Sequence, residues 1–402
     1  MSKRIAAIAF IFICTAIAWA VLSMTILART ETQDMKLRDA VGNLWGTSHT
    51  QQAPRLFTKY PQTSAATSDM LPLNASNVNV DLALEYRKKG LLWYSIYRVK
   101  FAGKYLIINS SKKASQIYFD FPLPAHGAIY DNFRFSIAGE ELKDVVFNQN
   151  RIIKVIQLEP KQSKEIQIYY ESQGLDKWYY DFGNNVSQIN NFSLVMNTNF
   201  ENIDFPDNTM APVVKERTGS GWKLTWKYDK LLTDVKIGLA MPEKLNPGPW
   251  ATKVTAAAPV SLFLYFFLLF VLTTVKKIKI HPINYFFIGA AFFSFHLLLS
   301  YLVDHISIHL AFWTCSAVSV FLVISYMRLV VGLKFAFVEI ALSQLVYLVF
   351  FSYTFFFKGY TGLTITILCI CTLFIVMQFT GRVDWEKLFE KPAVPQKQET
   401  KS

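Results

Sequence analysis

The chain has 402 residues, of which 52% are hydrophobic and only 17% are charged. Globular proteins carry roughly 25% charged residues, so this composition excludes an ordinary set of soluble domains, and it also excludes disordered and collagen-like chains. The net charge of +12 is typical either of a nucleic-acid-binding protein or of a membrane protein.

The distribution of the charges separates these two explanations. Residues 29–253 hold 28 Lys and Arg against 23 Asp and Glu, whereas the rest of the chain holds 13 against 6 and is strongly apolar. The basic side chains of the middle region are therefore balanced by acids, which argues against a nucleic-acid partner. We interpret the chain as a membrane protein with a large soluble middle region.

Six apolar runs are long enough to cross a hydrocarbon core of about 30 Å as helices. The first, Ile5–Ala28, follows two basic residues and predicts an uncleaved anchor, with a cleaved signal peptide as the alternative. The other five lie at about residues 256–275, 283–303, 306–327, 335–357 and 359–380. The predicted domains are an anchor over 1–28, a soluble domain over 29–255, a five-helix bundle over 256–381 and a tail over 382–402.

The positive charges of the short loops predict the orientation of these spans. With the N-terminus in the cytoplasm, the outer short loops hold only Lys358. The inner side then holds twelve cations: Lys3, Arg4, Lys276, Lys277, Lys279, Arg328, Lys334, Arg382, Lys387, Lys391, Lys397 and Lys401. This asymmetry predicts that both termini are cytoplasmic and that the domain over 29–255 is periplasmic.

The soluble domain has the pattern of antiparallel β structure. A short helical stretch over Met35–Leu44 and a loop over Thr47–Asn79, with at most one short strand, precede it. From Asp81 onward apolar and polar residues alternate in short runs separated by turns, which is typical of a sandwich. The first two predicted strands are Asp81–Tyr86 and a long strand with Leu92–Val99 that stops at the turn Ala102-Gly103-Lys104. The others are 105–109, 116–122, 129–137, 144–147, 152–158, 165–171, 192–199, 222–227 and 235–241. The segment Pro242–Pro249 is then expected to be a stiff tether.

The soluble domain shows no catalytic or metal-binding motif. Its two histidines, His49 and His126, belong to no metal-ligand spacing, and no phosphate-binding or dinucleotide fingerprint occurs. The sequence therefore predicts no catalytic residue, no metal and no cofactor. The aromatic stretch Gly174–Phe182 favours packing at a corner of the sandwich, and the alternative is a stacking surface for glycans.

Polar residues inside the predicted spans are candidates for function. His296, Ser300 and Asp304 are spaced by four, so they share one face of the third span, and Glu339, Ser343 and Tyr347 repeat this spacing on the fifth. Ionisable groups at such depth are costly, about 2.5–3.5 kcal/mol on insertion scales, and face the interior of a bundle. A proton or ion path through His296, Asp304 and Glu339 is one explanation, and structural hydrogen bonds between helices are the other.

Two further candidates lie at the ends of the third span. His281 and Pro282 stand beside Lys276, Lys277 and Lys279, and this basic loop either binds anionic lipid headgroups or is an ordinary turn. At the other end His305 follows Asp304 close to the membrane surface.

The motifs around these residues resemble the CreD family of bacterial inner-membrane proteins. The similarity lies in His281-Pro282-Ile283-Asn284-Tyr285, in Phe295–Ser300, in Val303-Asp304-His305, in Tyr326 and in Arg382-Val383-Asp384-Trp385. It covers about residues 256–386 and becomes weak in the soluble domain. The sequence departs from the family pattern where Asn284 replaces Gln, His296 replaces Tyr and Val303-Asp304 replaces Ser-Glu, and Thr273-Thr274 stand where the family often has an acidic residue.

The resemblance implies a non-enzymatic inner-membrane protein with a role in cell-envelope integrity or stress. It supplies no catalytic residues, and because His296 departs from the pattern it weakens the transport hypothesis. The β domain is then expected to bind or scaffold, with the lipid bilayer, other envelope proteins or peptidoglycan as partners. The alternatives are a proton- or solute-coupled transporter and a membrane partner of a two-component signalling system. The oligomeric state is not predicted.

Overall fold

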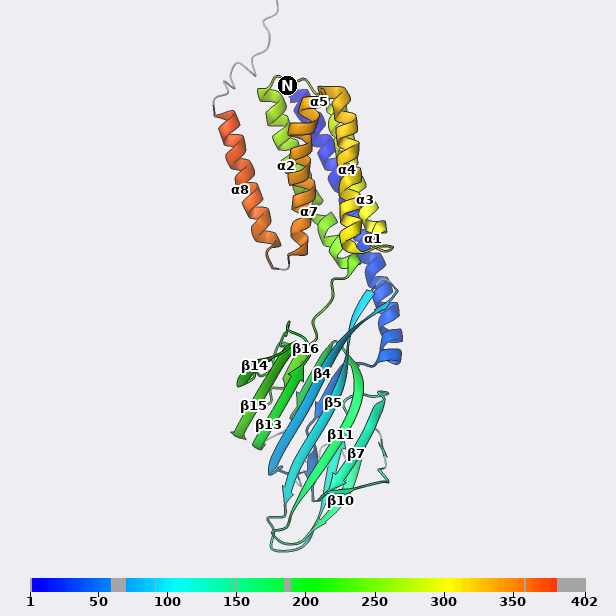
Figure 1. Ribbon diagram of the computed structural model, residues 1–402, viewed down its shortest axis with the longest axis vertical. Coiled ribbons are helices and arrows are strands. Elements are labelled where there is room, and N and C mark those ends of the chain that lie inside the picture. The colour runs from blue at the N-terminus through cyan, green and yellow to red at the C-terminus, as the bar shows by residue number, and fades with distance from the viewer. Residues whose placement is uncertain are drawn as a thin grey trace, which may run out of the picture. The chain divides into compact units, whose positions relative to one another are not determined.

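A computed structural model describes residues 2–58, 70–90, 92–145, 147–148, 150–183, 189–357 and 359–381. The chain divides into two compact units, Met1–Gln33 with Asn246–Ser402, and Asp34–Leu245. Figure 1 shows the first as a helical bundle and the second as packed sheets. The predicted tail over 382–402, with its Arg382–Trp385 motif, lies outside the described residues.

The helical unit contains six helices that are long and apolar enough to cross a membrane, counted over the described residues. Their bounds are α1 Ser2–Trp45, α2 Pro247–Val275, α3 Pro282–Leu302, α4 Ile308–Val331, the fifth span Leu333–Phe356, and α8 Thr361–Thr380. This confirms the predicted α-helical membrane protein with six spans, and the bounds of α3 agree with prediction within one residue.

Two predicted boundaries in this unit are wrong. The helix α1 continues without a break to Trp45, because no Pro or Gly interrupts residues 28–41 and Glu, Gln, Lys and Met there are good helix formers. The helix α2 begins at Pro247, inside the predicted tether, because the fixed φ of proline suits the first turn of a helix.

The fifth span is not a uniform α-helix. It runs through α5 Leu333–Phe335, the π-helical η1 Ala336–Ile340, α6 Ala341–Gln344, the π-helical η2 Leu345–Phe350, α7 Phe351–Tyr353 and the 3₁₀ turn η3 Thr354–Phe356. A π-helical turn closes an i→i+5 hydrogen bond and therefore holds more residues than an α-helical turn.

The β unit consists of three sheets. The eight-stranded sheet has the order β14-β15-β13-β4-β5-β11-β7-β8, the five-stranded sheet β3-β2-β6-β10-β9, and the three-stranded sheet β1-β12-β16. The strand bounds are β1 His49–Gln52, β2 Arg55–Phe57, β3 Met70–Leu71, β4 Ala75–Lys89, β5 Leu92–Ile108, β6 Ser115–Pro122, β7 Tyr130–Ile137, β8 Glu140–Glu141, β9 Phe147–Asn148, β10 Arg151–Leu158, β11 Ser163–Leu175, β12 Lys177–Asp181, β13 Ile189–Thr198, β14 Val214–Thr218, β15 Gly221–Leu231 and β16 Ile237–Ala240.

The inner faces of the sheets form one apolar core, which confirms the sandwich-like fold. Phe101 of the eight-stranded sheet packs on Phe121 of the five-stranded sheet with ring centroids 6.1 Å apart, and Trp178 of the three-stranded sheet is fully buried in the same core. Most ladders are antiparallel, but β4 pairs with β13 and β1 pairs with β12 in parallel.

Several strands differ from the sequence-based expectation. The strand β5 continues through Gly103, where a break was expected, because Gly103 pairs with both neighbouring strands and its missing side chain makes room for the Tyr105 ring. The expected loop over Thr47–Asn79 contains β1, β2, β3 and the start of β4 where the structure describes it. Strands β12 and β14 were also missed.

The aromatic stretch Gly174–Phe182 is part of the core. It ends β11 and forms β12, and Trp178 and Tyr180 are completely buried there. The packing explanation is therefore right for these two rings, and they are inaccessible as a stacking surface for glycans.

A buried polar cluster lies close to this stretch. The Tyr97 hydroxyl donates to the Lys177 carbonyl at 2.8 Å and accepts from the His49 amide at 3.2 Å, while the fully buried His49 ring meets the Tyr97 ring edge-on. Beside it the Tyr170 hydroxyl donates to Gln51 Oε1 at 2.8 Å. The backbone of Gln173 is the polar group that faces the His49 ring.

Candidate functional site

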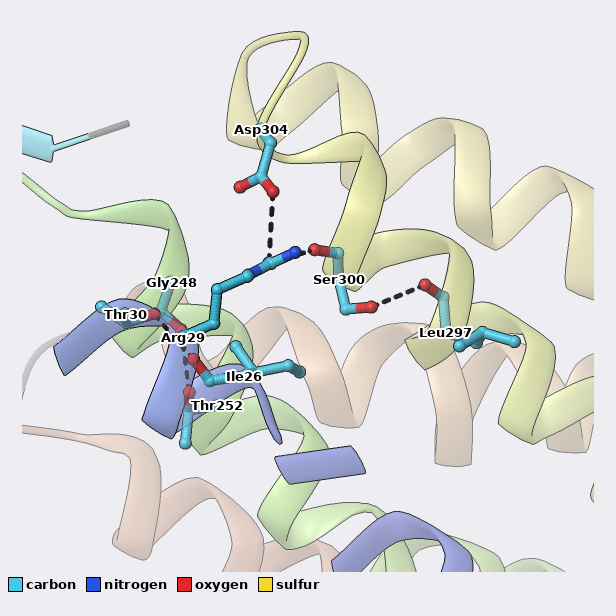
Figure 2. Close-up of polar contacts among 8 residues, drawn as sticks. All are labelled: Ile26, Arg29, Thr30, Gly248, Thr252, Leu297, Ser300 and Asp304. Atoms are coloured by element: carbon cyan, nitrogen blue, oxygen red, sulfur yellow. Dashed lines mark hydrogen bonds and ion pairs between the residues drawn. The ribbon is translucent and has the colours of Figure 1, made fainter. Parts of the chain in front are cut away.

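Asp304 is bound by an arginine that the sequence analysis did not single out. Arg29 Nη2 of α1 lies 3.1 Å from Asp304 Oδ2 and also donates to the Ser300 carbonyl at 2.8 Å (Figure 2). The Arg29 guanidinium lies 5.6 Å from the centroid of the Tyr301 ring. The Asp304 side chain is only 13% exposed and that of Arg29 32% exposed, so the pair is partly withdrawn from solvent.

Small residues bring α1 and α2 together next to this ion pair. Thr30 and Gly248 face each other in Figure 2, and a Cβ on Gly248 would lie 2.3 Å from Thr30 Oγ1. About two turns away on α1, the Ser23 hydroxyl donates to the Thr252 carbonyl at 3.3 Å. These contacts hold Arg29 where it can reach the end of α3.

His296 of α3 is buried and packs against α1. Its ring meets that of Trp19 on α1 edge-on at 5.5 Å, and its Nδ1 lies 3.1 Å from the Phe292 carbonyl. His296, Ser300 and Asp304 thus each have at least one contact with α1, which for Ser300 is made by its backbone carbonyl. No described residue forms a hydrogen bond with His296 Nε2.

The predicted stripe on the fifth span is divided between two neighbouring helices. Glu339 lies in η1 and forms an ion pair with Lys276, at the end of α2. Tyr347 lies in η2, and its hydroxyl forms a hydrogen bond of 2.7 Å with Thr372 of α8. Tyr347 also contacts α2, because its carbonyl accepts a hydrogen bond from the Ser261 hydroxyl.

His281, Pro282 and His305 have local roles in the structure. His281 is exposed and is the N-cap of α3, where its Nδ1 accepts from the Ile283 amide at 3.3 Å, and Pro282 is the first helical residue. His305 is exposed, and its amide donates to the Leu302 carbonyl. This geometry is that of an ordinary helix start and helix end.

The ionisable candidates do not form one continuous path. At 1.5 Å per residue, His296 lies about 21 Å along α3 from Pro282. Glu339 is paired near the Pro282 end and Asp304 near the opposite end, each with its own cation. The contacts are those expected of structural polar groups between helices.

Loss of the Asp304 carboxylate is expected to destabilise the bundle. In Asp304→Ala the Arg29 guanidinium loses an anionic partner while it stays partly buried, and we expect a loss of about 1–2 kcal/mol in the free energy of unfolding. Thermal unfolding of the purified protein in detergent measures this, with His305→Ala as the exposed neighbouring control. The double variant Arg29→Ala with Asp304→Ala should lose less free energy of unfolding than the sum of the losses in the two single variants. Additive losses would show that the ion pair does not couple α1 to the end of α3.

A second candidate site is a polar groove on the outer face of the eight-stranded sheet. It has a volume of about 530 Å³ and is formed by β5, β7 and β11. Cross-strand neighbours build its floor, because Tyr169 pairs with Ala102 on one side and with Arg134 on the other, and Gln167 pairs with Lys104. The small Ala102 beside the large Tyr169 leaves the surface hollow.

The charges of the groove are held in fixed positions. The Tyr169 hydroxyl donates to Glu171 Oε1 at 2.7 Å, Asn132 Nδ2 donates to the same oxygen at 3.3 Å, and the Arg134 guanidinium lies 5.9 Å from the centre of the Tyr169 ring. The hydrogen bond from Tyr169 lowers the pKa of Glu171, so this carboxylate is ionised at neutral pH. An aromatic ring between positive and negative groups can bind a polar ligand that carries both charges.

The two units lack the arrangements needed for metal chemistry as far as they are described. Among the described residues, no group of three or more His, Cys, Asp or Glu side chains is close enough to hold a metal ion. The four cysteines are free, and Cys369 and Cys371 lie on α8.

The model of one protein family, described as inner membrane protein CreD, matches residues 253–386. This segment of the chain is CreD-like. The match begins in α2 and includes α3, α4, the fifth span and α8, and it confirms the resemblance seen in the motifs. The anchor α1 and the β unit lie outside it.

Matches to complete proteins add little. No curated protein matches the chain. A solved Legionella pneumophila chain, provisionally named a nutrient-binding protein, has 11% sequence identity and a TM-score of 0.32, with 55% of this chain and 76% of that chain covered. A score this low supports no inference about fold or ligand.

Two motif positions on different helices of the CreD-like segment are in contact. The Tyr326 hydroxyl of α4 donates to Asn284 Oδ1 of α3 at 2.7 Å. The amide of Asn284 therefore supplies an acceptor at the place where the family pattern has Gln. Arg29 and the groove lie outside the segment, so the family motifs could not reveal them.

Proposed function

We propose that the chain is a non-enzymatic protein of the bacterial inner membrane that contributes to cell-envelope integrity, with its β unit as a periplasmic binding module. The observation that supports this is the polar groove of the eight-stranded sheet, with Tyr169, Arg134 and Glu171 fixed on one face. The CreD-like segment supports membrane localisation, and the cation asymmetry of the short loops supports the orientation.

The ligand is proposed to be a polar envelope component, either peptidoglycan or another envelope protein. Both offer amide groups and charges that a tyrosine ring flanked by Arg134 and Glu171 can bind. An extended polar chain also matches a groove that crosses three neighbouring strands.

A photo-cross-linking residue in the groove tests this proposal in cells. A benzophenone amino acid at Gln167 should give discrete adducts with an envelope protein or with peptidoglycan fragments, identified by mass spectrometry. The same amino acid at Ser220, in the exposed turn between β14 and β15, is the control. Tyr169→Ala should weaken the Gln167 adducts; adducts that are absent, or the same from both positions, would contradict the proposal.

Transport and two-component signalling stay as alternatives that no observation favours. The ionisable residues proposed for a path are each engaged with separate partners, namely Arg29, Trp19 and Lys276. The tail proposed for contact with a sensor kinase lies outside the described residues.

A further inference from the structure

An apolar groove lies between α1 and α2 at the N-terminal end of the bundle. It has a volume of about 360 Å³ and is lined by Ile5, Ala9 and Phe12 of α1 and by Phe263, Phe267 and Phe270 of α2. The spacing of four and three residues on each helix makes the lining continuous along the helix axes, over about 10 Å. Its length and its apolar walls suit part of an acyl chain.

A partly buried cation lies at one end of this groove. The Arg4 guanidinium lies 5.8 Å from the centre of the Phe270 ring, and the Tyr285 hydroxyl is close to it. Its Nε and Nη2 are shielded from solvent, yet none of the described residues accepts a hydrogen bond from either atom. The Tyr285 hydroxyl carries no charge, so an anion that accepts from these two donors would stabilise the partly buried guanidinium further.

We infer that this groove binds an anionic phospholipid, with its phosphate on Arg4 and one acyl chain along the Ala9 side of α1. A guanidinium presents paired N–H donors that match a phosphate. The apolar lining of the groove begins next to the guanidinium, at Ile5 and Phe270. Lys3 beside Arg4, and Lys277 and Lys279 after α2, add positive charge at the same end of the bundle. The site is independent of the proposed binding module.

Lipid retention by the full-length protein tests the site. The protein is reconstituted in nanodiscs with equal amounts of phosphatidylglycerol and phosphatidylcholine, and the lipids that stay bound on transfer to detergent are counted by native mass spectrometry. Wild-type protein should retain phosphatidylglycerol, and Arg4→Gln should weaken this retention by about tenfold, the scale of a lost charge-assisted contact.

Matched variants distinguish a specific lipid site from non-specific attraction of anionic lipid to basic residues. Lys3→Gln removes the same charge one residue away and should change retention less than twofold. Ala9→Trp fills the groove and should abolish retention, whereas Ala6→Trp adds the same bulk on an exposed position outside the groove lining and should not. Equal losses in Arg4→Gln and Lys3→Gln, or equal retention of the two lipids by wild-type protein, would overturn the proposal.

Discussion

Replacement of Gly221 by alanine is expected to destabilise the β unit by about 3 kcal/mol. Gly221 begins β15, and a Cβ there would lie 1.9 Å from the Thr198 carbonyl oxygen and 2.6 Å from its carbon. Both are backbone atoms of β13, so the clash is relieved only if the two strands separate. Because β13 joins β15 to the rest of the eight-stranded sheet, the loss should extend through that sheet.

Pulse proteolysis of the full-length protein in detergent, as a function of urea, measures this loss. The β unit of Gly221→Ala should become cleavable at a much lower urea concentration than that of the wild type. Ser220→Ala, in the adjacent exposed turn, should behave as wild type. A Gly221→Ala protein with an unchanged midpoint would show that β13 and β15 are not as close as described.

The stability of the β unit is expected to fall by about 3 kcal/mol between pH 6.5 and pH 4 because of His49. Burial lowers the pKa of His49 from 6.5 to about 4, while in the unfolded chain it keeps its usual value. The unfolded state therefore takes up a proton as the pH falls below about 6.5, and the folded state does so only near 4. The free energy of unfolding is therefore unaffected by His49 above pH 6.5 and falls as the pH decreases from 6.5 to 4. Below pH 4 both states bind the proton, and His49 causes no further loss.

His49→Phe should flatten this dependence, because a ring of similar size fills the site without titrating. The same proteolysis assay at a series of pH values gives the free energies, and the exposed His126→Gln is the control that should keep the wild-type slope. A wild-type slope in His49→Phe would mean that other groups cause the pH dependence.

The sequence was sufficient for the spans and for most strands because local patterns determine them. The third span was predicted within one residue, since His281 and Pro282 mark its start by capping and by a fixed φ. His296 and Ser300 lie on the regular helix α3 and Asp304 in the turn after it, and each has a contact with α1. Glu339 and Tyr347 lie in π-helical segments, which have no simple sequence pattern and were not predicted.

The sites depend on contacts between distant residues, and these could not be predicted. Arg29 was missed because it follows the apolar run of α1, where a basic residue is usual, and Asp304 lies 275 positions later. The groove on the sheet requires Ala102, Arg134 and Tyr169 to lie side by side, which depends on the order of β5, β11 and β7. The short strands β1 and β12 were missed because they pair with each other in parallel across a long stretch of sequence, and no local pattern marks them.

Display of the β unit outside the cytoplasm is the claim on which the proposed function depends, and cysteine labelling tests it most directly. In a variant whose four native cysteines are alanine, Ser220→Cys should react with a membrane-impermeant maleimide in intact spheroplasts, and Lys279→Cys should react only after permeabilisation. Both positions are exposed, so access alone decides the outcome. Protection of Ser220→Cys together with labelling of Lys279→Cys in intact spheroplasts would contradict the account.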